Sequence, residues 1–347
     1  MSATTANRRA PESAAQVELS RRSQSPLQRI QHLLHAHAWL SPLLLLLLTV
    51  VVFSIANPRF LQPGSLSLQA QQTAVVAALA LGQTLVILTA GIDLSVGAVT
   101  ILSTMIMASL AANNGVPGGL ALVIGIFFGL LAGFLNGLLI TRINLPPFIV
   151  TLGTLSIFTA IALMYSGGSS IQDNRLPDAI NWAGVGFTFL GFRLTTGVVI
   201  VLVMYLVVGF VLSQTAWGRH VYAVGDDPES ARLSGIETKR VLLSVYAVAG
   251  LLFGIAGWVL IGRSAGATPN AITDGNLQSI TAVVIGGTSL FGGRGGVLGT
   301  LLGALTVNAF QFGLSLAGVD QQPRVLAVGV LVIVAASIDQ WIRKVKS

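Results

Sequence analysis

Cysteine is absent from the 347 residues, and histidine is rare. Without a thiol the chain can form neither disulfides nor thiolate metal sites. All four histidines lie in polar flanking segments, so we expect no membrane-embedded histidine metal site. They are His32, His35, His37 and His220. The sequence therefore predicts no metal site.

Charge is also scarce: 9% of residues are charged, against about 25% in soluble domains, and 53% are hydrophobic. Uncharged runs of roughly 20 residues are typical of transmembrane helices. We therefore predict an all-α polytopic membrane protein with about ten transmembrane helices, within a range of about eight to ten. The predicted spans are 39–55, 71–90, 94–112, 118–140, 147–165, 194–212, 241–261, 277–290, 297–316 and 326–341. The eighth is short for a full crossing and is predicted to be a partial or broken span.

Basic residues gather at both ends of the chain, and we attribute them to cytoplasmic termini rather than to nucleic-acid binding. Residues 1–37 show little periodicity and are predicted to be a largely disordered cytoplasmic segment. Residues 38–342 form the predicted transmembrane domain, which includes a cytoplasmic loop at 213–240. Residues 343–347 form a short cytoplasmic tail. The predicted outer loops are 57–68, 166–193 and 262–276.

The predicted cytoplasmic loop is dense in charge, and such a stretch in an apolar chain has to lie in water. Pro228 suits a first helical turn, and Asp226 or Asp227 suits its N-cap. Gly235 would end this helix just after Leu233. The pattern predicts a short, exposed, capped helix that a soluble partner can contact.

Glycine is abundant, with 39 copies, although inside a helix in water it costs about 1 kcal/mol relative to alanine. In a membrane, small residues let helices approach closely. Two stripes of glycine recur at helical spacing, and we interpret them as surfaces for tight helix packing. The first is Gly125, Gly129, Gly133 and Gly137, and the second is Gly250, Gly254 and Gly257.

Two glycine-containing segments echo each other. GIDLSVG at 91–97 and GTSLFGG at 287–293 share Gly, Leu and Gly at matching positions, and both are predicted near the cytoplasmic side. Many transporters are built from repeats, but three matches leave an internal repeat open. The run GGTSLFGGRGG lacks the Lys-Ser/Thr ending of a phosphate-binding loop, so we interpret it as a flexible hinge.

Asp93 is the only acidic residue between Trp39 and Tyr165. An ionisable group in a membrane segment is costly and suggests function. Asp93 could cap a helix that opens at Leu94, or it could couple transport to protons. Neutral polar side chains in the spans either hydrogen-bond a hydroxylated solute or join helices. The candidate pathway residues are Gln83, Asp93, Ser95, Asn136, Thr151 and Asn308.

No Ser/His/Asp set, paired carboxylates or HExxH motif occurs, so the sequence does not predict an enzyme. Four strings instead resemble the permease subunit of bacterial ATP-binding-cassette (ABC) sugar importers, in the group of ribose, xylose, arabinose and fructose permeases. The resemblance runs from about Phe60 to Trp341. The strings are GQTLVILTAGIDLSVGAV, NGLLITRINLPPFIVTLGT, GRHVYAVGDDPESARLSGI and VVIGGTSLFGGRGGVLGTLLGAL.

This resemblance implies a type II ABC importer-like permease that moves a monosaccharide across the bacterial inner membrane by alternating access. It implies three partners: a second permease copy, a cytoplasmic ATPase that binds ATP and Mg, and a periplasmic sugar-binding protein. The chain itself has no nucleotide-binding motif and no predicted cofactor. The matching coupling residues are Asp226, Asp227, Pro228, Glu229, Ser230, Ala231, Arg232, Leu233 and Gly235. Such permeases usually have Gly-Asn where this chain has Asp226-Asp227.

Three alternatives accompany this interpretation. The first is an ion-coupled secondary transporter that uses Asp93 and needs no ATPase. The second is a branched-chain amino-acid permease, against which the GIDLSVG string favours sugar. The third is a non-transporting membrane scaffold or receptor, which the polar residues within the spans disfavour.

Overall fold

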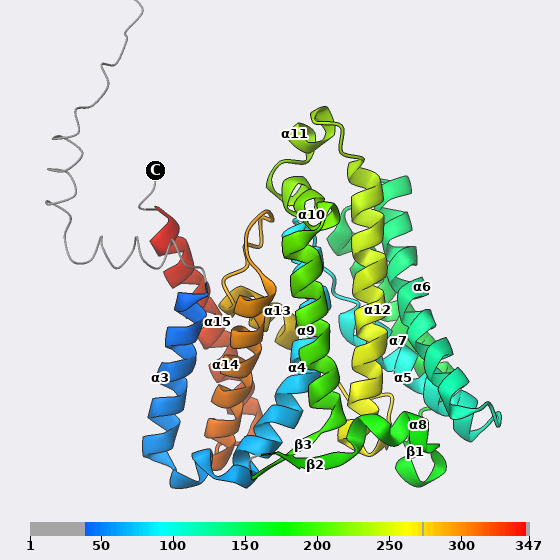
Figure 1. The fold of residues 1–347 in the computed structure, drawn as a ribbon, viewed down its shortest axis with the longest axis vertical. Helices are drawn as coiled ribbons and strands as arrows, with labels where there is room; N and C mark the ends of the chain where they lie inside the picture. The colour runs from blue at the N-terminus through cyan, green and yellow to red at the C-terminus, as the bar shows by residue number, and fades with distance from the viewer. Residues whose placement is uncertain (1–38, 190, 273, 345–347) are drawn as a thin grey trace, which may run out of the picture.

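The computed structural model describes residues 39–344 apart from 190 and 273. Within this range the chain is a bundle of long helices with a few short strands, which confirms the predicted all-α class (Figure 1). The predicted N-terminal segment and residues 345–347 of the predicted tail lie outside the described residues. The long helices are α3 (Leu40–Ala56), α4 (Pro63–Leu88), α5 (Val96–Ala112), α6 (Gly118–Arg142), α7 (Pro147–Ser166), α9 (Thr196–Gln214), α12 (Thr238–Ser264), α13 (Gly275–Ile285), α14 (Val297–Leu316) and α15 (Gln321–Lys344).

These helices follow the predicted spans in order. Six of those in the described part, α4, α6, α7, α9, α12 and α14, are long and apolar enough to cross a membrane by length and composition. Helix α13 has only 11 residues, or about 16 Å, against a hydrocarbon core of about 30 Å. The predicted partial span is therefore confirmed: its helix ends at Ile285, and an irregular link leads to α14.

The start of α4 and an additional helix are two of the differences from the predictions. The predicted loop 57–68 is wrong in its second half, because α4 already begins at Pro63, a residue whose fixed φ favours the first helical position. The first half contains the short 3-10 helix η1 (Pro58–Leu61). Within the polar loop the structure adds a helix that we did not predict, α10 (Ala216–Asp226). Val221 and Val224, three residues apart, bury its apolar face.

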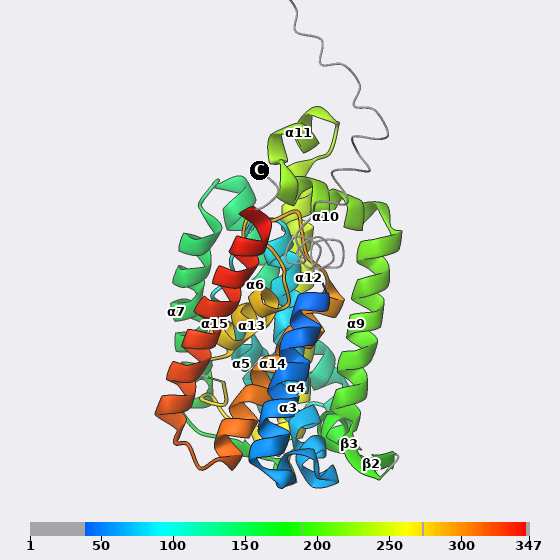
Figure 2. The ribbon, with the colours of Figure 1, turned by 90° about the vertical axis from the view of Figure 1, so that its left-hand side faces the viewer.

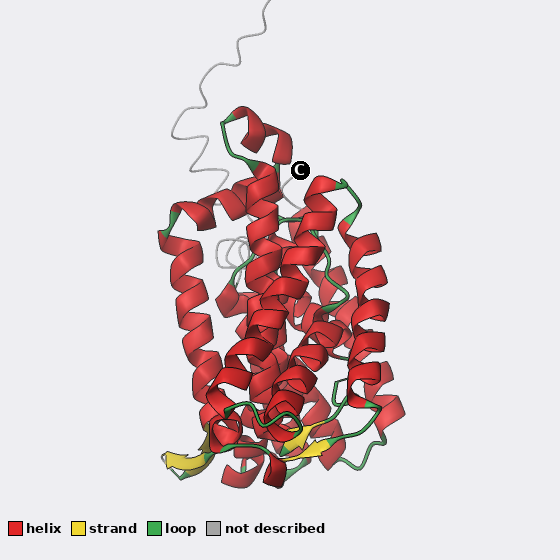
Figure 3. Cartoon of the chain, turned by 90° about the vertical axis from the view of Figure 1, so that its right-hand side faces the viewer, coloured by secondary structure: helices red, strands yellow, loops and turns green. Residues whose placement is uncertain are grey.

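One end of the bundle carries the strands (Figure 3), and we call it the hairpin end. Strand β1 (Ile171–Gln172) pairs antiparallel with β4 (Gly266–Ala267), and β2 (Gly186–Phe189) forms a hairpin with β3 (Phe192–Thr195). The short elements η2 (Asp173–Arg175), α8 (Asp178–Asn181) and η3 (Trp182–Gly184) lie between β1 and β2 in sequence. Helix α11 (Pro228–Leu233) protrudes from the opposite end, which we call the α11 end (Figure 1).

Helix α4 is the central element of the bundle. Its most apolar stretch is 89% buried, whereas the corresponding stretches of α6, α7 and α9 are only 28%, 28% and 33% buried. Helices α12, α13 and α14 pack extensively around α4. Figure 2 shows α7 and α9 on opposite sides of the molecule. Helices α6, α7 and α9 therefore turn most of their apolar surface away from the rest of the chain.

The two glycine stripes meet each other, which confirms the packing interpretation. A β-carbon added at Gly129 would lie 2.6 Å from the Gly250 carbonyl oxygen, and one at Gly250 would lie 2.8 Å from the Gly133 Cα. Helices α6 and α12 thus touch backbone to backbone. Such close approach is how membrane helices gain van der Waals contact in lipid, where the hydrophobic effect does not drive helices together.

We expect Gly133→Ala to destabilise the protein, since the new methyl group would overlap the Tyr246 carbonyl oxygen. Overpacking of this kind costs about 1–3 kcal/mol. The matched control is Gly153→Ala on α7, where an added β-carbon meets nothing within 4 Å. Thermal unfolding in mild detergent, monitored by size-exclusion chromatography, should show a lower unfolding midpoint for Gly133→Ala only. Equal midpoints for the two variants would contradict backbone contact.

Candidate functional site

Helix α11 is built as the sequence predicts, with Asp227 rather than Asp226 as its cap. The Asp227 carboxylate accepts hydrogen bonds from the Glu229 and Ser230 backbone N–H groups, at 2.9 and 3.1 Å. The Ser230 hydroxyl donates a third, at 2.6 Å. These bonds, chiefly those from Ser230, hold the pKa of Asp227 below its usual value near 3.8. The helix therefore starts at Pro228 with a charged, well-bonded cap.

The helix also ends as predicted. Gly235 adopts the left-handed conformation, with φ of 86°. Its N–H donates to the Arg232 carbonyl, and the Ile236 N–H donates to the Ala231 carbonyl, both at 3.0 Å. This is a Schellman motif, in which glycine carries no steric penalty. Two turns of helix are thus fixed at both ends.

The surface of α11 is open. Glu229 and Arg232 pair at 2.7 Å while their side chains stay 66% and 64% exposed, and Leu233 is 77% exposed. Arg232 holds the pKa of Glu229 below its usual value, first through their hydrogen bond and then through its charge. Ala231 alone is buried. An apolar tip beside a compact ion pair is a surface that another protein can contact.

We expect Asp227→Ala to loosen the first turn of α11, while Asp227→Asn keeps a capping acceptor. Amide hydrogen exchange of the 228–233 segment should be several-fold faster in the alanine variant than in the asparagine variant. Because the folded pKa of Asp227 is lowered, the charged cap is fully present above the unfolded pKa and is lost as pH falls through the folded value. Equal exchange in both variants would contradict the capping role.

At the base of α11, three backbone segments cross without intervening side chains. The Gly293 N–H donates to the Leu88 carbonyl at 3.0 Å. A β-carbon at Gly225 would overlap that same carbonyl oxygen, and one at Gly292 would lie 2.5 Å from the Gly225 carbonyl oxygen. We call Leu88, Gly225, Gly292 and Gly293 the glycine junction. It joins the end of α10 to the α4–α5 and α13–α14 links.

The glycine junction brings the two echoing segments together. GIDLSVG spans the α4–α5 link and the first two residues of α5, and GTSLFGG lies in the α13–α14 link. The two links meet where the Gly293 N–H donates to the Leu88 carbonyl. Tyr222 of α10 ties the second link further by donating to the Gly295 carbonyl at 3.0 Å. Gly292 and Gly293 have φ of 84° and 69°, conformations that favour glycine. The second link is thus an irregular segment packed against α10.

Five of the six predicted pathway residues gather around the α4–α5 link. The Asp93 carboxylate accepts from the Ser95 N–H and hydroxyl, at 2.7 and 2.6 Å. Asn136 of α6 donates to the Ser95 hydroxyl at 2.9 Å. Thr151 of α7 donates to the Ile92 carbonyl at 3.1 Å. We call Gln83, Asp93, Ser95, Asn136 and Thr151 the buried polar cluster, since none is more than 1% exposed.

Gln83 of α4 completes this cluster from the other side. With its amide nitrogen turned toward the Asp93 carbonyl, it donates there at 3.1 Å and accepts from the Asp93 N–H at 3.3 Å. That orientation satisfies both ends of the amide. The cluster therefore fixes one irregular stretch of backbone to three helices. Its members bond one another and the backbone, and their role in a pathway stays a prediction.

One detail of the predicted site is corrected. Asp93 is not the N-cap of a helix that opens at Leu94, because α5 begins at Val96 and its N-cap is Ser95. Asp93 instead accepts from the N–H two residues on, a turn that short acidic side chains favour and that delays the helix. Asn308 lies apart from the cluster, where it donates to the Gln69 carbonyl at 3.1 Å.

A cavity of about 180 Å³ opens immediately after the cluster, between α5, α7 and the segment leading into α13. Its polar side chains are neutral, and none of the residues that line it is charged. Thr159 is exposed, so the cavity lies at the edge of this single chain. The lining residues are Gly97, Ala98, Ile101, Leu155, Thr159, Ala162, Pro269, Asn270, Ile272 and Asn276.

The sequence did not single out the polar residues of this cavity. Thr159 is one threonine among many in apolar spans, while Asn270 and Asn276 lie in or beside a predicted outer loop. Periodicity carries no signal for them, since the cavity forms only where three segments distant in sequence meet. Gly97, the last residue of GIDLSVG, and the adjacent Ala98 are the lining residues that belong to a quoted motif.

Comparison with known proteins gives consistent matches along the chain. The profile of a family described as "Branched-chain amino acid transport system / permease component" matches residues 66–336. The fructose import permease of Rhizobium meliloti is 45% identical over 323 residues, covering 92% of this chain and 90% of its own length. The ribose import permease of Bacillus subtilis is 38% identical over 301 residues, covering 87% and 92%. The D-allose transport permease of Escherichia coli K12 is 32% identical over 307 residues, covering 86% and 91%.

Proposed function

This chain belongs to the permease family of ABC monosaccharide importers, and we propose that it carries a monosaccharide across a bacterial inner membrane, driven by a separate ATPase. As a multi-pass permease subunit it is not an enzyme. Its relatives are named for fructose, ribose and allose, which supports a pentose or hexose as the solute. Both termini and the α11 end then face the cytoplasm, while the hairpin end faces a periplasmic sugar-binding protein.

The cavity beside α7 supports a sugar over the other solutes. Thr159, Asn270 and Asn276 offer a hydroxyl and two amides, which suit the hydroxyl groups of a neutral sugar. An amino acid would bring an ammonium and a carboxylate, and no residue lining the cavity is charged. Asp93, the residue that ion coupling would use, does not line it. Because the cavity lies at the edge of one chain, a second permease copy would enclose it.

The observation that carries the mechanism is the glycine junction. Movement of α11 by the ATPase displaces the end of α10, and Gly225 lies directly on the Leu88 carbonyl and Gly292. With no flexible side chain between these backbones, the displacement reaches both links. The buried polar cluster holds the α4–α5 link as one unit, and Gly97 leads from it to the cavity. ATP binding by the partner ATPase thereby shifts the equilibrium between the conformation in which the cavity opens outward and the one in which it opens inward.

We expect the triple variant E229A/R232A/L233A to lose the ATPase, since it removes the exposed surface of α11. The matched control is E237A/T238A/R240A, which removes another exposed i,i+3 ion pair, at 2.6 Å. Pull-down of the tagged chain from native membranes measures ATPase binding. Uptake of radiolabelled fructose, ribose and allose measures transport. Wild type and control should retain the ATPase and transport one of these sugars. The proposal would be overturned if the α11 variant still bound the ATPase. It would also be overturned if no ATPase co-purified with the wild-type chain even after cross-linking.

The glycine junction predicts a different defect. Among molecules that fold and bind the ATPase, Gly225→Ala should lower sugar uptake by about tenfold, because its methyl group would overlap the Leu88 carbonyl oxygen and separate α10 from the two links. Gly296→Ala, in the same link, is the control, since the nearest atom to its added β-carbon is the Tyr222 hydroxyl oxygen of α10, at 3.9 Å. Uptake, ATPase pull-down and size-exclusion profiles are measured together. Normal uptake by a folded, ATPase-bound Gly225→Ala would show that coupling does not pass through the junction.

A further inference from the structure

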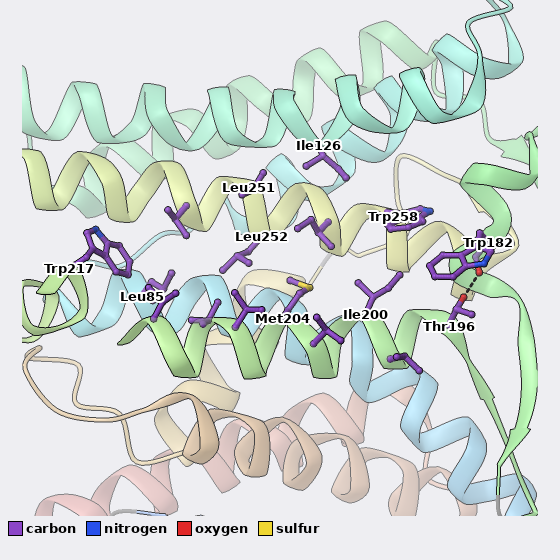
Figure 4. Close-up of a pocket in the computed structure, with 17 residues that line it drawn as sticks. Leu85, Ile126, Trp182, Thr196, Ile200, Met204, Trp217, Leu251, Leu252 and Trp258 are labelled. Atoms are coloured by element: carbon purple, nitrogen blue, oxygen red, sulfur yellow. Dashed lines mark hydrogen bonds between the residues drawn. The ribbon is translucent and has the colours of Figure 1, made fainter. Parts of the chain in front are cut away.

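A long apolar groove runs between α9 and α12 (Figure 4), and it shares no lining residue with the cavity or the glycine junction. Its volume is about 920 Å³. Met204 and Val207 of α9 form one wall, Leu252 and Ile255 of α12 form the other, and Leu85 of α4 contributes to the floor. Thr196 has the only hydroxyl in the lining, and it donates to the Trp182 carbonyl. The groove thus offers no free polar side chain along its length.

Tryptophan closes both ends of the groove. Trp217 lies at the α11 end, and Trp182 and Trp258 stack at the hairpin end with ring centroids 5.7 Å apart. Trp217 donates its indole N–H to the Ser244 hydroxyl at 2.8 Å, and Trp258 donates to the Ile180 carbonyl at 2.9 Å. Tryptophan concentrates where a membrane meets water. The groove therefore extends between the two interfacial levels of the bilayer.

The groove's dimensions suit acyl chains. The lining runs along α9 from Thr196 to Val211, a rise of about 22 Å. An extended hydrocarbon chain about 4.5 Å wide occupies roughly 350 Å³ over the same length. Two such chains, the complement of one phospholipid, fit.

Charge at the α11 end indicates the headgroup. Arg219 and His220 follow Trp217 on α10, and Arg219 is exposed. Arg219 makes no ion pair with any described residue. The first turns of α10, from Ala216 to Val224, contain no acidic residue. A cation at this level attracts an anionic headgroup.

We propose that the α9–α12 groove is a binding site for one anionic phospholipid, with its acyl chains along α9 and its phosphate beside Arg219. Bound acyl chains make van der Waals contacts with the groove lining that an empty groove would lack. They also support α9, whose most apolar stretch is only 33% buried by protein and which leads directly into α10. The lipid would thus steady the helix that carries the proposed docking element.

The test is native mass spectrometry of the full-length chain in mild detergent with added phosphatidylglycerol or phosphatidylcholine. Wild type should keep one phosphatidylglycerol after detergent washing. V203F/V207F fills the groove and should bind it about tenfold more weakly, equivalent to about 1.4 kcal/mol. The matched control L202F/L206F adds the same bulk to α9 residues outside the lining, 47% and 73% exposed, and should bind like wild type.

A second variant tests the headgroup without altering the groove. Arg219→Gln should lower the preference for phosphatidylglycerol over phosphatidylcholine while leaving total lipid retention unchanged. If V203F/V207F and its control retained phosphatidylglycerol equally, the bound lipid would be general boundary lipid, and the proposal would be overturned. The proposal would also be overturned if the wild-type chain kept no lipid, or if a second copy of the chain occupied the groove. If V203F/V207F fails to fold, an unchanged lipid preference in Arg219→Gln would still overturn it.

Discussion

Backbone lies directly on backbone at several crossings in this bundle, and glycine makes each of them possible. Helices α6 and α12 meet through Gly129, Gly133 and Gly250, and α13 meets α14 where Gly286 faces Gly299. A helix pair in lipid gains stability from dispersion contacts, which fall off steeply with separation. These crossings set how tightly the outer helices enclose α4. The glycine junction applies the same constraint to three irregular segments.

Polar groups at membrane depth impose the second constraint. The α4–α5 link is not helical, so its backbone groups need partners that lipid cannot provide. Gln83 and Thr151 bond that backbone directly, from α4 and α7, and Asn136 of α6 donates to the Ser95 hydroxyl. One function of these buried polar residues is therefore to hold an irregular segment at a fixed place. In our proposal the sugar contacts come instead from the cavity just beyond Gly97, which Thr159 and two asparagines line.

The two sides of the bundle differ in what they can do. Around α4, α12 and α14 the helices pack extensively against one another. Helix α9 has an apolar groove behind it, and its most apolar stretch is only 33% buried by protein. Because α9 leads into α10 and α11, a sparsely buried helix lies next to the proposed docking element. A bound phospholipid would join the bilayer to the moving part of the permease.

Local chemistry determined most of what could be read from the sequence alone. Hydropathy fixed the class and the order of the spans, helix-capping residues fixed the position of α11, and glycine spacing fixed the packing faces of α6 and α12. Each of these depends on residues close together in the chain. The start of α4 at Pro63 and the existence of α10 also have local causes, but the surrounding polar residues obscured them.

Only the tertiary structure decided where distant segments meet. The sequence had no means to place Gly225 on the Leu88 carbonyl, or to set Gln83 against Asp93. The cavity and the groove were equally inaccessible, because each is bounded by helices far apart in the sequence, and their lining residues look like any other residues of an apolar span. Hydropathy and capping act within a few residues of the chain, whereas cavities and crossings depend on how whole helices pack in three dimensions.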